Sequence, residues 1–208
     1  MALFLGYDPG GTGKHGVASA DIGPNGACLA EPATMTLAHA GEVRDWLRQH
    51  ASAKALDIDT LLAWSISGGR ACDNALRDHY PEQAPTVIAQ NSLYSAMTIN
   101  GILVAKTGRK LGVPLFESHP KLLLGAALEE DPEGVELVAR HHAMLEAATS
   151  KAARAKADHM ADALVAAWCA SRWWFNRWTD DLYAMTKDDL TFPAGPAVYP
   201  WPEPAGST

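Results

Sequence analysis

Apolar runs and amphipathic stretches alternate along the chain, and their order predicts an α/β fold. Residues 2–7 form a short apolar run that ends at Asp8 and is followed by proline and glycines, as at the end of a buried strand. Strand-like runs at 16–22 and 27–36 flank a Gly-Pro-Asn-Gly turn, and an Asn-Gly pair in this position is a strong hairpin signal. The chain is therefore expected to open with a three-stranded meander.

The rest of the chain combines amphipathic stretches with short apolar ones. Helices are expected at 40–54, 93–111, 135–148 and 152–178, and strands at 60–66 and 114–118. Strands separated by helices pair in parallel through crossover connections. The predicted fold is thus α/β, a five-stranded mixed sheet flanked by helices, with the first strand central and next to 60–66. Gly101 should lie inside its helix, and Trp46, Trp64 and Trp168 should be buried.

Length and composition limit the domain organisation. The chain has 208 residues, 48% hydrophobic and 20% charged, which is the balance of one globular domain. We expect an α/β domain at 1–178 and a C-terminal extension at 179–208 that packs on it. The sequence shows neither a signal peptide nor an apolar run of about 18 residues, so a cytoplasmic protein without membrane contact is expected. The three cysteines are far apart and lack metal-ligand spacing.

The net charge limits how the protein could bind nucleic acid. A formal net charge of −7 argues against a protein that coats nucleic acid non-specifically, because such binding depends on many Lys and Arg contacts to phosphate. An enzyme that binds nucleic acid through a local basic patch is still compatible with this charge.

Carboxylates stand at three places where a metal site would need them. Asp8 and Glu117 each end a predicted strand, and ligands bind at the carboxyl ends of parallel strands. Asp162 interrupts an apolar helix, and Asp158 and His159 precede it by four and three residues, so all three can reach one face. These five side chains are the candidate metal ligands, and Asp8, Glu117 and Asp162 are the catalytic candidates. Because clustered like charges need a cation, oxygens of Asp8 and Asp162 should lie within about 6 Å and bind Mg²⁺ or Mn²⁺.

Each of these residues also has a purely structural interpretation. Asp8 belongs to a residue type that commonly caps turns. Glu117 could instead pair with the N-terminus of the helix that follows it. Of Asp158 and His159, one could simply face water.

Three motifs occur in an order that resembles the RNase H-like superfamily. They are GYDPGG at 6–11, FESHPK at 116–121 and DHMADALVAAWCA at 158–170. Within that superfamily the chain resembles the RuvC-type Holliday junction resolvases and a bacterial family of predicted nucleases with the same fold. The resemblance implies a Mg²⁺-dependent phosphodiesterase with two metal ions about 3.5 to 4 Å apart. Asp8, His159 and Asp162 match its ligand positions, and a homodimer is compatible with it.

One ligand position departs from the resolvase pattern. The middle acid of the resolvases belongs at the end of the strand expected at 60–66, where this chain carries no carboxylate. Glu117, one strand later, is the candidate replacement. Without a replacement, one of the two metal ions would be poorly held.

The same resemblance supplies candidates for substrate binding. The bacterial family pairs a Gly-Arg with a later Asp, as Arg70 and Asp73 do here. Arg70 is therefore a candidate phosphate ligand, or else is salt-bridged to Asp73. Gly10 and Gly11 would let a ligand approach the backbone closely, and Lys121 is a basic group close to Glu117 in sequence.

Three functions compete at this point. The leading one is a divalent-metal-dependent nuclease acting on structured or single-stranded nucleic acid. The second is an ATP-dependent phosphotransferase, because residues 8–12 also resemble the first phosphate loop of the sugar kinase and acetate kinase superfamily, although the chain is too short for the second lobe of those enzymes. The third is a non-catalytic nucleic-acid-binding or assembly module, which the missing middle acid and the acidic net charge favour.

Overall fold

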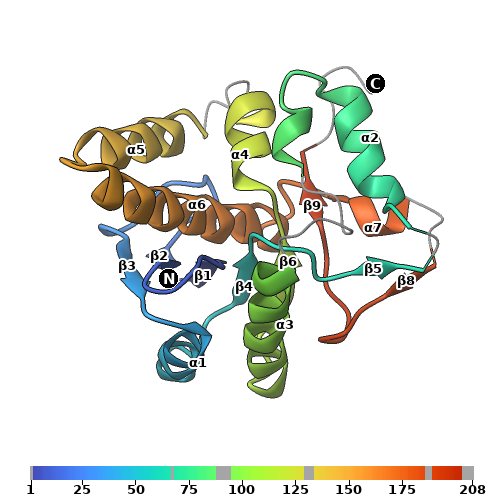
Figure 1. Ribbon diagram of the computed structural model, residues 1–208, viewed down its shortest axis with the longest axis horizontal. Helices are drawn as coiled ribbons and strands as arrows, with labels where there is room; N and C mark the ends of the chain where they lie inside the picture. The colour runs from blue at the N-terminus through green and yellow to red at the C-terminus, as the bar shows by residue number, and fades with distance from the viewer. Residues whose placement is uncertain (1, 67, 88–94, 129–133, 186–188, 203–208) are drawn as a thin grey trace.

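The core of the protein is a five-stranded mixed sheet in the order β3-β2-β1-β4-β6 (Figure 1). A computed structural model describes residues 2–66, 68–87, 95–128, 134–185 and 189–202. The strands of the sheet are β1 (Leu3–Asp8), β2 (His15–Asp21), β3 (Ala33–Leu37), β4 (Ala55–Ile58) and β6 (Leu115–Glu117). β1, β2 and β3 form an antiparallel meander, whereas β4 and β6 run parallel to β1. The central position predicted for the first strand is confirmed.

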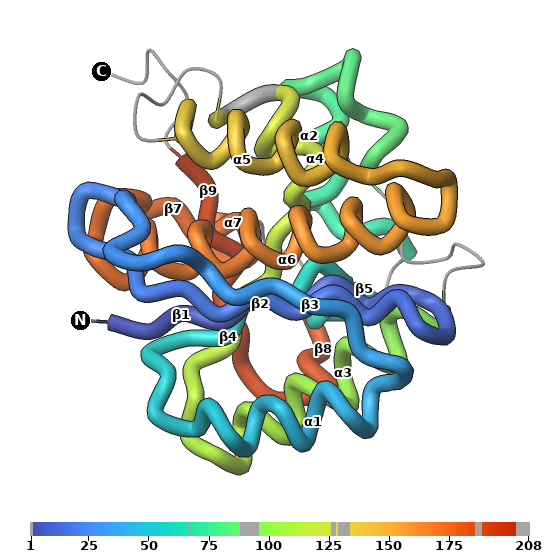
Figure 2. The backbone as a smooth tube through the Cα atoms, turned by 90° about the vertical axis from the view of Figure 1, so that its left-hand side faces the viewer, coloured from blue at the N-terminus to red at the C-terminus, as the bar shows by residue number. Residues whose placement is uncertain are grey.

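Helices cover both faces of this sheet. They are α1 (Ala40–Gln49), α2 (Ala71–His79), α3 (Ser95–Lys110), α4 (Pro120–Leu122), α5 (Val135–Glu146), α6 (Lys151–Trp174) and α7 (Leu182–Met185). Figure 2 shows α1 and α3 on one side of the sheet and α6, with α5 above it, on the other. Each side has its own cluster of buried apolar side chains. The predicted start of the helix at 93–111 lies outside the described residues.

Short elements complete the chain. A 3₁₀ turn, η1 (Ala84–Thr86), follows α2, and a π-helical turn, η2 (Leu123–Ala127), continues α4. Two small two-stranded sheets pair β5 (Trp64–Ser65) with β8 (Leu190–Thr191) and β7 (Asp180–Asp181) with β9 (Pro200–Trp201). Among the described residues, no helix has both the length and the apolarity needed to cross a membrane.

Helix α6 lies directly on the sheet because two glycines leave room for its backbone. A Cβ atom at Gly6 would lie 1.7 Å from the carbonyl oxygen of Ala163, and one at Gly16 would lie 2.0 Å from that of His159. Any larger residue would push the helix away, since real Cβ atoms do not approach backbone oxygens this closely. These glycines therefore bring the N-terminal half of α6 against the end of β1, where Asp8 lies.

The fourth strand of the sheet lies earlier in the sequence than predicted. It spans Ala55–Ile58, whereas the prediction of a strand at 60–66 is wrong. Residues 61–63 are buried in a loop, and within the predicted range the structure has only the two-residue β5. The apolar run misled the prediction because a buried loop carries the same composition as a buried strand.

β4 is hard to recognise in the sequence because it contains a buried acid. Asp57 lies inside the strand and is fully buried. Burial raises the pKa of Asp57 to about 8, so the carboxyl group is protonated at neutral pH. The hydroxyl of Ser118 donates a hydrogen bond of 2.6 Å to its Oδ1 atom. A neutral, hydrogen-bonded carboxyl can occupy a strand interior that an isolated carboxylate could not.

The tryptophans follow the predictions in part. Trp46 and Trp168 are buried, as expected. Trp64 is 38% exposed, so the prediction that it is buried is wrong. The error has the same cause as the misplaced strand, because Trp64 belongs to the short β5 pairing and not to the central sheet.

The segment near the C-terminus lies along the edge of the central sheet. The backbone N–H of Val198 donates to the carbonyl of Leu115 at 3.1 Å, and the N–H of Glu117 donates to the carbonyl of Val198 at 2.9 Å. Tyr199 and Trp201 are buried next to these bonds. The edge strand β6 is thereby paired on both sides, which protects it from association with other chains. Residues 203–208 of the expected extension lie outside the described residues.

Gly101 lies inside α3, as predicted, and packs against the segment after β4. A Cβ atom there would lie 2.1 Å from Cγ2 of Thr60 and 3.5 Å from Cγ2 of Ile58. We therefore expect Gly101→Ala to destabilise the protein by about 1–2 kcal/mol in urea unfolding, because overpacking outweighs the helix propensity gained. Adding Thr60→Ser removes Cγ2 and should restore most of the loss. A Gly101→Ala variant as stable as wild type would contradict this packing.

Candidate metal centre

Three carboxylates meet where the sheet touches α6. Asp8 ends β1, Asp59 directly follows β4, and Asp162 comes from α6. One oxygen atom of each lies within 4.8 Å of the others. Asp8 and Asp162 are almost fully buried, and Asp59 is partly buried. The oxygens of Asp8 and Asp162 thus lie within the separation predicted from the sequence.

The register of the sheet explains why Asp59, and not Glu117, joins Asp8. Tyr7 pairs with Ile58, and Ile58 pairs with Glu117. Successive side chains of a strand point to opposite faces, so Glu117 shares the face of Tyr7, away from α6. Asp8 and Asp59 each come one residue later and point toward α6. Glu117 is therefore one residue out of phase with the other two acids.

Asp59 is the residue that the sequence interpretation missed. The middle acid was judged absent because the strand was placed at 60–66. With β4 at Ala55–Ile58, an acid follows the strand directly, in the position where the resolvase pattern expects one. The alternation of apolar and acidic residues in Leu-Asp-Ile-Asp, residues 56–59, was a signal that could have identified it.

Asp8 is held by His159. A hydrogen bond of 2.6 Å joins His159 Nδ1 and Asp8 Oδ2. Burial raises the pKa of Asp8 to about 7, and the charges of Asp59 and Asp162 add to the rise, while His159 opposes it. Burial disfavours a charged His159, yet its hydrogen bond to Asp8 and the Asp8 charge raise its pKa above the ordinary value. The pair can therefore share a proton near neutral pH.

Asp59 has a histidine partner of its own. His119 Nδ1 lies 3.7 Å from Asp59 Oδ1, and the imidazole is buried. Burial raises the pKa of Asp59, and Asp162 adds to this effect, whereas His119 opposes it. His119 was not among the candidates predicted from the sequence, although it lies two residues after Glu117 and inside one of the three motifs.

Asp162 has a cation and a histidine as neighbours. Lys121 Nζ lies 2.5 Å from Asp162 Oδ2 and 3.0 Å from Asp158 Oδ2. His141 Nε2, from α5, lies 3.2 Å from the other oxygen of Asp162. Partial burial opposes the lysine charge, but Asp162 and Asp158 raise the pKa of Lys121 well above its ordinary value. Asp162 thus contacts a charged ammonium group on one side and an imidazole on the other.

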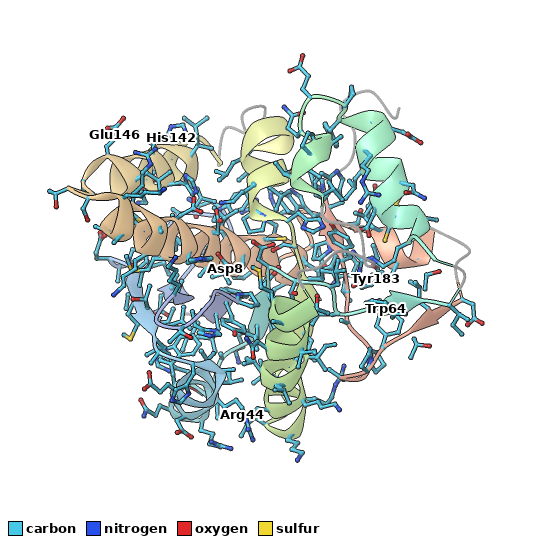
Figure 3. All side chains as sticks on the ribbon, in the orientation of Figure 1. Asp8, Arg44, Trp64, His142, Glu146 and Tyr183 are labelled. Carbon is cyan, nitrogen blue, oxygen red and sulfur yellow. The ribbon has the colours of Figure 1, made fainter. Side chains whose placement is uncertain are left out.

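Glu117 belongs to a second, fully buried cluster. Arg70 Nη2 lies 2.6 Å from Glu117 Oε1 and 2.6 Å from Asp73 Oδ1. The N–H of Leu62 donates to Glu117 Oε2 at 2.5 Å, and the Tyr183 hydroxyl donates to the same oxygen. Figure 3 labels a member of each cluster, Asp8 beside α6 and Tyr183 to its right. The structure does not bring Glu117 together with Asp8 and Asp162.

Arg70 has no exposed surface with which to bind a phosphate. It is 0% exposed, and Asp73 and Glu117 satisfy its charge. Of the two interpretations of Arg70, the structure contains the salt bridge to Asp73. Gly10 and Gly11 form the turn after β1, in which the N–H of Lys14 donates to Gly11 at 2.9 Å, and they lie outside the described lining of the cavity.

A cavity of about 320 Å³ opens over the three carboxylates. Its polar wall holds Asp8, Asp59, Asp162, His159 and Lys121. Its apolar wall holds Leu61, Pro85, Met97 and Leu122. The acids therefore lie at one side of a pocket that a small polar group with an attached apolar ring could enter.

Comparison with known proteins identifies no relative. No protein-family model matches the chain. No curated protein and no solved structure matches it either. The function of the site is therefore inferred from its geometry.

The donor atoms determine what the site can do chemically. Carboxylate oxygens are the preferred ligands of Mg²⁺ and Mn²⁺. Like charges gathered in a buried place are unfavourable unless a cation or protons offset them. Burial is the main cause of the raised pKa of Asp8, and repulsion from Asp59 and Asp162 adds to it. The residues present therefore fit a divalent cation at Asp8, Asp59 and Asp162.

Proposed function

We propose that the protein is a divalent-metal-dependent phosphodiesterase of the RNase H-like fold that cleaves nucleic acid. The observation that carries the proposal is the meeting of Asp8, Asp59 and Asp162, with one oxygen of each within 4.8 Å of the others. The strand order, with an antiparallel meander followed by two parallel strands and a long helix across the end of β1, supports the fold assignment. Asp59 supplies the middle acid that the resolvase pattern requires.

The neighbouring side chains have roles that follow from their contacts. His159 fixes the orientation of Asp8 through its hydrogen bond, as second-shell partners of metal ligands do. His119 lies within ion-pair distance of Asp59. When bound, a Mg²⁺ or Mn²⁺ ion lowers the pKa of a water and stabilises charge on phosphate oxygens. Lys121 adds a protonated donor at the edge of the cavity, where a phosphate oxygen can accept a hydrogen bond.

The cavity favours a nucleotide in an unpaired strand as the group that enters. Its volume, about 320 Å³, is at the lower end of ligand pockets. Leu61, Pro85 and Met97 offer an apolar surface to a base, and Lys121 is the single Lys or Arg in the cavity lining that the structure describes. With a net charge of −7, long contacts along a duplex backbone are disfavoured. Single-stranded or locally opened nucleic acid fits this arrangement better than regular duplex.

The test is cleavage of labelled branched, single-stranded and duplex substrates with Mn²⁺ or Mg²⁺. We expect metal-dependent cleavage by wild type, with unpaired regions preferred, and loss of cleavage in Asp8→Asn. Asp45→Asn, an exposed acid of α1, is the matched control and should keep full activity. Equal cleavage by wild type and Asp8→Asn would show that the activity comes from a contaminant. No Mn²⁺ binding at millimolar concentration would favour the non-catalytic binding module.

The two other functions each lose one of the observations that favoured them. The binding module was favoured by the acidic net charge, which still stands, and by the absence of a middle acid, for which Asp59 is now the candidate. The phosphotransferase was favoured by the resemblance of residues 8–12 to a phosphate loop. Gly10 and Gly11 in that segment are not part of the described cavity lining.

A further inference from the structure

Lys121 lies among acids that would otherwise form a second cation site. It belongs to the short helix α4, which follows β6, and its ammonium group reaches Asp158 and Asp162 on α6 at 3.0 and 2.5 Å. His141, Asp158 and Asp162 each offer a ligand atom, and the three atoms lie within 4.8 Å of one another. Asp162 is common to this group and to the group of Asp8 and Asp59.

The two groups differ in how their charge is neutralised. In the described part of the chain, the ion pairs of Asp8 and Asp59 are to the histidines His159 and His119. The pair Asp158 and Asp162 has the lysine ammonium between them. A primary ammonium is a compact positive charge with three donors. Two of the donors serve these carboxylates, and the third is left for another acceptor.

We infer that the ammonium group of Lys121 occupies the second cation position of this site, so that the protein binds one divalent ion instead of two. The ion binds at Asp8, Asp59 and Asp162, and the lysine supplies the other positive charge. The remaining donor of Lys121 then faces the phosphate of the substrate. The inference rests on the proposed function, because it assigns the charges of the same site, and it departs from the two ions that the resolvase resemblance implies.

The side chain of Lys121 is suited to this role because it is only partly covered. Its side chain is 47% exposed, whereas that of Asp162 is 1% exposed. The ammonium group thus lies at the rim of the cavity and the carboxylate at its floor. Removing the charge would leave Asp158 and Asp162 facing each other beside His141, with room for an ion in place of the lysine head group.

The experiment counts Mn²⁺ ions bound per chain, by calorimetric titration and by the loss of the free-ion signal in electron paramagnetic resonance. Wild type should bind one ion and Lys121→Met two. Lys121→Arg keeps the charge and should bind one. Lys54→Met is the matched control, since Lys54 precedes β4 at the opposite end from Asp59, and it should also bind one. Adding Asp158→Asn to Lys121→Met should return the count to one.

The outcomes separate this inference from the proposed function. Two ions in wild type, or one in Lys121→Met, would overturn the inference and leave the metal-dependent enzyme standing. No ion in wild type would overturn the proposed function, and the inference with it. A wild-type count of two overturns the inference whether or not any variant folds, and Lys121→Arg shows whether a change at this position leaves the protein folded.

Discussion

Asp59→Asn is expected to abolish metal-dependent cleavage and to weaken Mn²⁺ binding by at least about 100-fold, because even the loss of a second-shell partner costs 10–100-fold. The change removes one of the three carboxylates that meet at the cavity floor. The free energy of unfolding without metal should rise, since an amide avoids the cost of burying the Asp59 carboxylate, which is the main cause of its raised pKa, and removes its repulsion of Asp8 and Asp162. Titration with Mn²⁺ and urea unfolding with a chelator present would measure the two effects.

Glu117→Gln is the informative comparison, because Glu117 was the sequence-based candidate for the same position. Its carboxylate contacts Arg70 and accepts hydrogen bonds from Leu62 and Tyr183, so its loss should lower stability and leave Mn²⁺ affinity unchanged. If Glu117→Gln abolished Mn²⁺ binding in a folded protein and Asp59→Asn did not, the assignment of the middle acid would have to be reversed.

The parts of the fold that depend on local signals could be predicted from the sequence. The apolar run before Asp8, the Asn-Gly turn and the amphipathic helices each form a pattern within about 15 residues. The central place of β1 followed from the meander and the crossovers together. These features needed no knowledge of distant contacts.

The fourth strand was harder to predict, because the partner that stabilises it lies elsewhere in the chain. Asp57 breaks the apolar pattern, and what makes it tolerable is the hydroxyl of Ser118, which lies 61 residues later. An apolar loop at 61–63 offered a more conventional strand. The alternation of Leu56 and Ile58 with Asp57 and Asp59 is a weaker local signal than that apolar run. The strand and the acid at its end were therefore missed together.

The sequence identified only part of the candidate site, and the missing part has the same cause as the missed strand. Asp8 and Asp162 were found because each interrupts an apolar element, which is unusual without a partner. Glu117 was chosen because it lies at the same edge of the sheet as Asp8, without regard to the face of the sheet to which its side chain points. The face on which Glu117 lies follows from the pairing of Tyr7 with Ile58 and of Ile58 with Glu117. That pairing can be derived only when β4 is placed correctly.

Arg70→Met is expected to cause the largest loss of stability, about 3–5 kcal/mol, because breaking a buried ion pair leaves its partners uncompensated. The guanidinium is fully buried between Asp73 and Glu117. It also lies 5.8 Å from the ring centre of Tyr183 in α7, so it contacts both α7 and Glu117 at the end of β6. Urea unfolding monitored by circular dichroism would measure the change.

Arg48→Met provides the matched control for this loss. Arg48 pairs with Asp45 on the surface of α1, where both side chains are largely exposed, and exposed pairs contribute about 0–1 kcal/mol. Combining Arg70→Met with Glu117→Gln should cost less than the sum of the two single changes, because the second removes an acid that the first leaves unpaired. If Arg70→Met unfolded no more easily than Arg48→Met, this cluster could not be structural, and Arg70 would return as a candidate for binding phosphate.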